Sequence, residues 1–245
     1  MSTRADGPKP RRRGRGFLIF LVIVLIILVV GDRVAESVAE KRLATEAVNE
    51  AAQYDVTAAS TKAEIGGFGF LPQLVKGEFS EITVTMDQPS VSKVSAEELT
   101  MVMKDIQIPR ELLTGDTSAT VTVSRADVHL KMSPAALTKL TSAASGIEGL
   151  NLSAVGEKLQ AKLTVRGFDA TATVRPEVRN GRIGLIVENL PEGVPSQVRT
   201  VITALLARGV RIPDLPFGAR VTGVDVQDQS LLVTATATDV KLSGS

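Results

Sequence analysis

Few side chains of this sequence could act as acids, bases, nucleophiles or metal ligands. The chain of 245 residues holds one histidine, His129, and no cysteine, so thiolate metal sites are excluded and a zinc site or catalytic triad is disfavoured. Asp127 stands two residues before His129, on the same face of an expected strand, where it could orient a general base. No serine stands at a spacing that would complete a triad with them. We therefore expect no catalytic residue, no metal site and no cofactor, and a protein that is not an enzyme.

Residues suited to contact apolar groups gather in one stretch, IGGFGFLPQLVKGEFSEITVTM, at residues 65–86. Phe68 and Phe70 stand two residues apart between glycines, just before Leu71, although only 3% of the chain is aromatic. Two interpretations remain open. Either the rings plug the end of the core, which is the commonest fate of phenylalanine, or they form an apolar cluster on a loop. Phe217, in LPFG, raises the same two alternatives.

Positive charge is concentrated at the amino terminus rather than on the body of the chain. Residues 1–31 hold six of the 28 Lys and Arg residues and one of the 27 Asp and Glu residues, which leaves 22 basic against 26 acidic residues in 32–245. A body with net negative charge, no basic stripe and few aromatic side chains does not fit a nucleic-acid-binding protein. Single cations at strands or strand ends could still meet a phosphate, and none of them stands out: Lys104, Arg110, Lys131, Arg166 and Arg175.

The first 31 residues have the pattern of an export or anchoring signal. A basic segment, residues 1–16, precedes an apolar segment, residues 17–31, in which positions 17–30 carry no polar side chain. The basic end of such a segment stays in the cytoplasm, so we expect the rest of the chain on the extracytoplasmic side of the plasma membrane, in the cell envelope. The fourteen apolar residues would extend about 21 Å as a helix against about 30 Å of hydrocarbon, which favours a signal peptide over a full transmembrane span.

Two fates of this segment remain open. Cleavage after Ala39, in Ser37-Val38-Ala39, would release the domain, although this site lies farther from the apolar segment than is usual. Without cleavage, residues 17–31 would anchor the protein to the cytoplasmic membrane. A third alternative, a buried helix in a cytosolic protein, leaves the six flanking cations unexplained.

Changes of hydrophobic period divide the rest of the chain into helices and strands. Residues 32–54 lack Gly and Pro and predict a helix, either a stalk or the first helix of the domain. Asn180-Gly181 predicts a tight hairpin turn. One helix is predicted to begin at Ser133-Pro134, and a second, at 195–209, carries an apolar stripe that would cover a sheet. Alternation with period two predicts strands at 79–87, 99–108, 119–132, 161–174, 182–188, 220–227 and 231–242.

Two of these strands change phase within their length. Apolar residues of 121–132 move from odd to even positions, and in 163–174 the change falls at Gly167. A phase change of one residue indicates a bulge or kink, which bends a sheet. The sequence therefore predicts an α+β fold in which a curved antiparallel sheet wraps around or packs on one or two helices, after an N-terminal hydrophobic helix. Such a sheet can hold an aliphatic ligand between itself and a helix.

Four stretches of the chain resemble, in order, one known family. GFGFLPQLVKGEFSEITVTM is similar to the Gly-Phe-x-Phe-Leu-x-x-Leu signature near the start of the LmeA-family phospholipid-binding proteins of actinobacteria. The stretch IPDLPFGARVTGVDVQDQSLLVTATATDVKL resembles the closing hairpin of that family, and LTMVMKDIQIPRELL and VHLKMSPAALTKLT fall between the two in the expected order. The resemblance covers residues 57–242. It departs at Gly69, where many relatives have proline, and this leads us to expect a more flexible loop.

The resemblance implies a phospholipid-binding or lipid-transfer protein of the cell envelope, with a tubular fold like that of the BPI-like lipid-binding proteins. In mycobacteria the family is linked to maintenance of lipomannan and lipoarabinomannan synthesis. The lipid-binding domain would be residues 57–242, after the basic segment, the signal or anchor and a helix within 32–56. Its partners would be a phospholipid, with an anionic head group as one option, and the membrane; no protein partner can be named. The candidate lipid-binding residues are Phe68, Phe70, Leu71, Leu74 and Phe217.

Two other functions remain as alternatives. A membrane-tethered adaptor would use the sheet to dock an envelope enzyme, with side chains filling the space between sheet and helix. An enzyme acting on lipids or glycolipids would need paired acids, a nucleophile with its base or a metal cluster, and the sequence offers none of these at a recognisable spacing.

Overall fold

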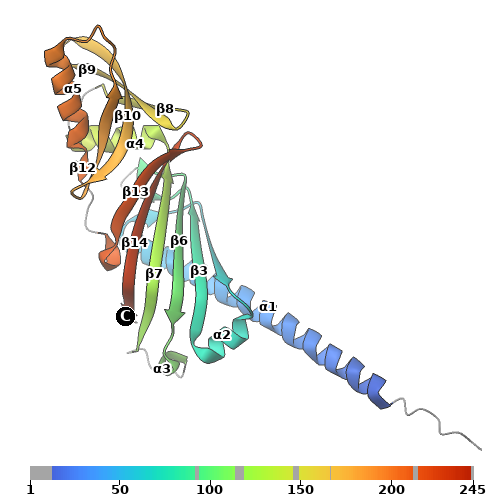
Figure 1. The fold of residues 1–245 in the computed structure, drawn as a ribbon. Coiled ribbons are helices and arrows are strands. Elements are labelled where there is room, and N and C mark those ends of the chain that lie inside the picture. The colour runs from blue at the N-terminus through green and yellow to red at the C-terminus, as the bar shows by residue number, and fades with distance from the viewer. Residues whose placement is uncertain are drawn as a thin grey trace, which may run out of the picture.

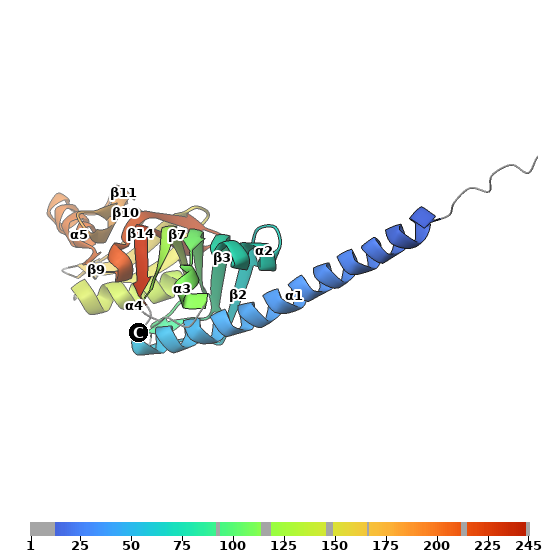
Figure 2. The ribbon, with the colours of Figure 1, turned by 90° about the horizontal axis from the view of Figure 1, so that it is seen from below.

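The computed structural model describes residues 13–91, 94–113, 119–145, 149–165, 167–211 and 215–243. Residues 1–12 of the predicted basic segment lie outside these ranges. The described part of the chain begins with a single long helix, α1 (Arg13–Gln53), which passes behind a sheet and projects well beyond it (Figures 1 and 2). Within the described residues, no helix combines the length and the apolar character that crossing a bilayer requires.

A six-stranded antiparallel sheet forms the larger part of the domain. Its strand order is β13-β14-β7-β6-β3-β2, so its centre is built from segments far apart in the sequence. The short helix α2 (Phe70–Lys76) connects the two strands at one edge, and α3 (Arg110–Leu113) follows a central strand. The strands are β2 (Ser60–Gly66), β3 (Glu78–Asp87), β6 (Glu98–Gln107), β7 (Thr120–Met132), β13 (Arg220–Gln227) and β14 (Ser230–Ser243).

A second antiparallel sheet of five strands stands at one end of the first (Figure 1). Its order is β12-β11-β10-β9-β8, and α4 (Pro134–Ser145) and α5 (Ser196–Arg208) pack against it. Its strands are β8 (Asn151–Val155), β9 (Lys158–Val165), β10 (Phe168–Arg179), β11 (Arg182–Asn189) and β12 (Val210–Arg211). Three short strands, β1 (Val56–Thr57), β4 (Ser90–Val91) and β5 (Val94–Ser95), form a small separate sheet, and a 3-10 turn, η1 (Pro216–Gly218), precedes β13.

The alternation of the sequence predicted most of these elements. Asn180 adopts a positive φ of 50° in the turn between β10 and β11, which confirms the hairpin. On α5, Val198, Ile202 and Leu206 are 5%, 0% and 2% exposed, so the predicted apolar stripe does cover the sheet. The structure is α+β with antiparallel sheets, as predicted, but the strands form two main sheets rather than one. The tubular architecture stays a prediction.

The phase change predicted in β7 is a bend shared by three neighbouring strands. Val123 of β7 pairs with Ile106 of β6 and with Val240 of β14. Arg125, two residues further along β7, pairs with Lys104 of β6 and Thr238 of β14. Each of the three strands therefore has one unpaired residue between these two rows. In the two outer strands of this group the unpaired residues are Asp105 and Asp239, both at positive φ (51° and 53°). The register is the same on both sides of this level, so the irregularity is a kink common to the three strands rather than a bulge in one of them.

The phase change at Gly167 has a different origin from the one predicted. The sequence predicted one kinked strand over 161–174, but the structure has two strands, β9 and β10, joined by a tight turn that includes Gly167. Gly167 has a φ of 82°, a conformation that suits glycine in a turn. A chain reversal and a bulge both shift the apolar positions by one, so the pattern alone does not separate them.

Most apolar side chains of the six-stranded sheet lie on one face, because cross-strand partners share a face. Val102 and Leu232, which pair with Asp127 and Lys131, lie on the other face. Two core clusters cover the ends of the apolar face. The distal core joins it to the five-stranded sheet, α4 and α5, and includes Leu231, Val233 and Ile202. The proximal core joins it to α1 and α2, and includes Phe79 and Ile82. The shared distal core links the two sheets into one packed unit.

Candidate functional site

The stretch with the two phenylalanines forms a protruding corner of the molecule at the β2–β3 edge. β2 ends at Gly66, a short loop follows, and α2 begins at Phe70. We call the exposed apolar side chains of this corner the apex: Phe68 is 94% exposed, Leu71 37% and Val75 72%. Phe68 and Val75 thus leave most of their apolar surface uncovered by the described residues, and Leu71 leaves about a third of its surface uncovered.

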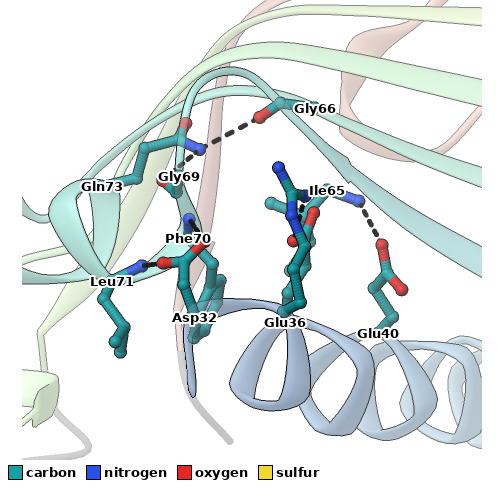
Figure 3. A network of polar contacts seen from close by, with 10 residues as sticks. Asp32, Glu36, Glu40, Ile65, Gly66, Gly69, Phe70, Leu71 and Gln73 are labelled. Atoms are coloured by element: carbon teal, nitrogen blue, oxygen red, sulfur yellow. Dashed lines mark hydrogen bonds and ion pairs between the residues drawn. The ribbon is translucent and has the colours of Figure 1, made fainter. Parts of the chain in front are cut away.

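Asp32 of α1 holds the beginning of α2. Its Oδ2 accepts a hydrogen bond from the backbone N–H of Phe70 at 3.0 Å, and its Oδ1 accepts one from Leu71 at 2.6 Å (Figure 3). The first N–H groups of a helix lack partners within the helix, so a carboxylate from another element caps α2. The hydrogen bond from Leu71, with a smaller contribution from Phe70, lowers the pKa of the Asp32 carboxyl below its ordinary value.

Gln73 closes the loop from inside. Its side chain is only 8% exposed, and its Nε2 donates to the carbonyl oxygens of Gly66 and Gly69, both at 3.1 Å (Figure 3). Its Oε1 accepts from the backbone N–H of Ser80 at 3.0 Å. Gly67 has a φ of 102°, and a Cβ there would lie 2.9 Å from the Gln73 amide, so glycine is required for the close approach.

These contacts change the expectation for Gly69. Its φ of 73° is closed to proline, whose ring fixes φ near −65°. A proline at this position would therefore need a different path for the loop. The sequence predicted a flexible loop because glycine replaces proline, but Asp32 and Gln73 hold this loop by hydrogen bonds at both of its ends.

The two phenylalanines have opposite environments. Phe70 is 8% exposed and packs in the proximal core, with its ring centroid 6.0 Å from that of Phe79. Leu74 packs against the same core. Phe68, by contrast, lies in solvent. Each of the two interpretations of the sequence therefore describes one ring.

Phe217 does not join this group. It is 51% exposed, in the turn η1 before β13, at the edge of the six-stranded sheet opposite to β2 and α2. Its φ of 57° is rare for a residue with a large side chain. The structure thus brings together Phe68, Phe70, Leu71 and Leu74 and leaves Phe217 apart; a lipid-binding role for each of the five stays a prediction.

A second apolar feature, which the sequence analysis missed, lies on the face of the six-stranded sheet between the two cores. Val84 pairs with Met101, and Met101 pairs with Val128, so the three side chains form a row across β3, β6 and β7. Leu99 lies next to this row on the same face. We call these four side chains the midline residues. They are only half buried and belong to neither core cluster.

A buried polar group without a partner lies close to the midline residues. The hydroxyl of Thr61, on the same face at the β2 edge, is buried and has no hydrogen-bond partner among the described residues. Helix α1 packs on this face through Ala35, Ala39 and Leu43, and the following turns present the small, half-buried residues Ala47 and Ala51.

Two shallow hollows lie along α1, outside these areas. They have volumes of about 380 and 430 Å3 and are lined by α1 side chains alone, from Val29 to Glu46. Neither lies between the helix and the sheet. An enclosed acyl cavity therefore stays a prediction.

The opposite face of the six-stranded sheet is polar. Asp127 accepts hydrogen bonds from Arg125 Nε at 2.7 Å and from Thr236 Oγ1 at 2.8 Å, and the bond from Arg125 is the main reason that the pKa of Asp127 lies below its ordinary value. His129 stands on this face between Thr100 and Thr234.

Two of the candidate cations are already paired with carboxylates. Lys104 lies 3.8 Å from Glu81, and Arg175 lies 3.5 Å from Glu188. Arg166 lies outside the described residues. No cation is thereby singled out as a head-group ligand.

Comparison with known proteins decides the class of this chain. A model of the LmeA-like phospholipid-binding family matches residues 30–236. The chain belongs to the LmeA-like phospholipid-binding family. No curated protein and no solved structure is significantly similar to it.

The extent of the match bears on the amino terminus of this LmeA-like chain. It begins at residue 30, two residues before Asp32, and so includes the part of α1 that packs on the sheet and caps α2. The LmeA-like family binds phospholipids and is not an enzyme family. The sites to explain are therefore those that could contact acyl chains.

Proposed function

We propose that this protein binds phospholipid by holding acyl chains against the midline residues, between the six-stranded sheet and α1. The observation that carries the proposal is the half-buried row of Val84, Met101 and Val128, on an apolar face that is closed on both sides of it. In a chain of a phospholipid-binding family, an incompletely covered apolar surface inside the domain is suited to an acyl chain.

The unpartnered hydroxyl of Thr61 supports the same location. A buried hydroxyl without a hydrogen bond costs about 1–3 kcal/mol, which an ester oxygen of a bound lipid would offset. The Thr61 side chain lies on the same face as Leu99 and in the same cross-strand row, because Thr61 of β2 pairs with Met86 of β3 and Met86 pairs with Leu99 of β6. An ester group near the β2 edge and an acyl chain across β3, β6 and β7 would satisfy both features.

The free energy of lipid binding favours exchange of lipid with a membrane over permanent retention of lipid by the protein. Transfer of an acyl chain of about sixteen carbons from water gains about 13 kcal/mol, at about 0.8 kcal/mol per methylene. The bilayer offers the same chain nearly the same gain, so most of this free energy cancels. Lipid can therefore pass between protein and membrane without an energy source.

The protein acts in the cell envelope, on the extracytoplasmic side of the plasma membrane, with the apolar segment of α1 in the lipid. Six cations before this segment support that orientation. Residues 32–39 make contacts within the domain, including those of Asp32 and Ala35, and this supports retention of the segment rather than cleavage after Ala39. A contribution to lipomannan, lipoarabinomannan or general lipid homeostasis follows from the family resemblance alone.

Mass spectrometry of residues 30–245, purified without detergent, tests the proposed binding. This fragment keeps Asp32 and the stretch that the family model matches. Native spectra should contain phospholipid at about one molecule per chain, and organic extraction should identify its head group. A fragment that carries no lipid and takes none from liposomes would contradict lipid binding and favour the adaptor function.

A further inference from the structure

The apex lies where the apolar part of α1 ends. Residues 21–30 of α1 are apolar, and each of their side chains is between 38% and 64% exposed, so no other described element covers this part of the helix. Asp32 is the first charged residue after it, and it contacts the backbone of Phe70 and Leu71 directly. At about 1.5 Å per residue, Asp32 lies only about 3 Å along the helix from Val30.

From this placement we infer that the apex is a second contact with the bilayer that holds the apolar segment of α1. The inference rests on the membrane attachment proposed above. Apolar side chains of interfacial proteins enter about 5–10 Å into the boundary between head groups and acyl chains. An apex beside the last apolar turn of α1 is within this depth. Phe68, Leu71 and Val75 then continue the apolar surface of the helix.

The contacts of the loop prepare the apex for this role. Asp32 fixes the apex to α1, and Gln73 fixes the loop to β2 and β3. An apolar tip that is already held in place loses little conformational entropy when it enters lipid. Two attachment points, α1 and the apex, also set the orientation of the domain, so that the α2 end of the β2–β3 edge meets the membrane.

A single tryptophan can test this contact, because the chain contains none. Phe68→Trp places the reporter at the apex, and its exposure of 94% leaves room for the larger ring. Val155→Trp is the matched control, since Val155 is 53% exposed at the end of β8 in the other sheet. Each full-length variant is reconstituted into phosphatidylcholine vesicles whose acyl chains carry bromine, which quenches tryptophan at short range.

The apex contact predicts blue-shifted emission and at least twofold quenching for Phe68→Trp, and unshifted, unquenched emission for Val155→Trp. Water-like emission from Phe68→Trp would overturn the inference. Monomeric short-chain brominated phosphatidylcholine distinguishes the bilayer from a bound ligand. Quenching of Phe68→Trp by these monomers, in the absence of vesicles, would assign the ring to the lipid-binding site and also overturn it. A 30–245 fragment that carries no stoichiometric lipid would contradict the proposed function. It would not change the quenching of Phe68→Trp that the apex contact predicts in brominated vesicles.

Discussion

At the scale of single residues, the two phenylalanines of the apex region have different roles. Phe70 is buried against Phe79, whereas Phe68 is exposed. We expect Phe70→Ala to lower the free energy of unfolding by about 3–5 kcal/mol, because it opens a cavity in the proximal core. Phe68→Ala should change it by less than about 0.5 kcal/mol. Urea unfolding followed by circular dichroism measures both, and equal losses from the two substitutions would contradict the assignment.

Asp32 gives the apex a defined pH dependence. The pKa of Asp32 is lowered in the folded protein, so its contact with α2 stabilises the fold at pH above the ordinary aspartate pKa of about 3.9. This stabilisation is lost as the pH falls further, through the lowered pKa of the folded state. We expect Asp32→Asn to speed hydrogen exchange of the Phe70 and Leu71 amides roughly tenfold at neutral pH.

Glu46→Gln, on an exposed part of α1, is the control for this substitution and should leave the two amides protected. Amide exchange followed by nuclear magnetic resonance gives the readout, after correction for the intrinsic pH dependence of exchange. Unchanged protection in Asp32→Asn would show that α2 does not need the carboxylate.

Sequence reasoning at this scale identifies residue types and leaves burial undecided. Phe68 and Phe70 have the same side chain and both stand next to glycine, so only the three-dimensional position separates them. Asp32 gave no signal at all, because its partners Phe70 and Leu71 are 38 and 39 residues away in the sequence. Gln73 could have been noticed as a polar residue between apolar positions of a short helix.

At the scale of elements, the midline residues can be tested by filling the space above them. We expect Val128→Phe to reduce bound phospholipid at least tenfold and to change stability by less than about 1 kcal/mol, because the added ring takes the place of the acyl chain. If the row is instead a closed core, the larger side chain should cost about 1–3 kcal/mol. Thr100→Phe, on the polar face of β6, is the control and should leave lipid binding intact. Lipid extraction and thermal unfolding measure the two effects.

The alternation of apolar and polar residues predicted the strands, because it shows which face of a strand is buried. It could not say what covers that face. The midline residues have the same sequence pattern as the core residues beside them, and only the positions of α1 and the two clusters reveal them as half buried. The turn at Gly167 was mistaken for a kink for a related reason, since one sequence pattern fits two backbone paths.

At the scale of the whole molecule, α1 belongs to both the domain and the membrane attachment. We expect the mature protein to retain residues 32–39, because removal of Asp32 and Ala35 would uncap α2 and uncover part of the proximal core. Intact-mass measurement of protein from native membranes tests this. A mature chain that begins at Glu40 would contradict retention. Glu40 itself accepts a hydrogen bond from the Ile65 N–H at 3.0 Å, so cleavage there would also disturb the end of β2.

The order of the strands lay beyond sequence reasoning, because the neighbouring strands β7 and β14 join segments about a hundred residues apart. Local periodicity contains no information on such pairings. The class of the protein could be predicted, since four stretches in the right order resemble one family, and the match over residues 30–236 confirms it.

The location of bound lipid is the central claim, and photo-crosslinking tests it most directly. A phospholipid with a photoreactive group in its acyl chain is loaded onto residues 30–245, irradiated, and the modified peptides are identified by mass spectrometry. We predict adducts on β3, β6 and β7 at the midline residues, and their loss in Val128→Phe. Adducts confined to the apex or to the polar face, with none on the midline residues, would contradict this account of how the protein holds its lipid.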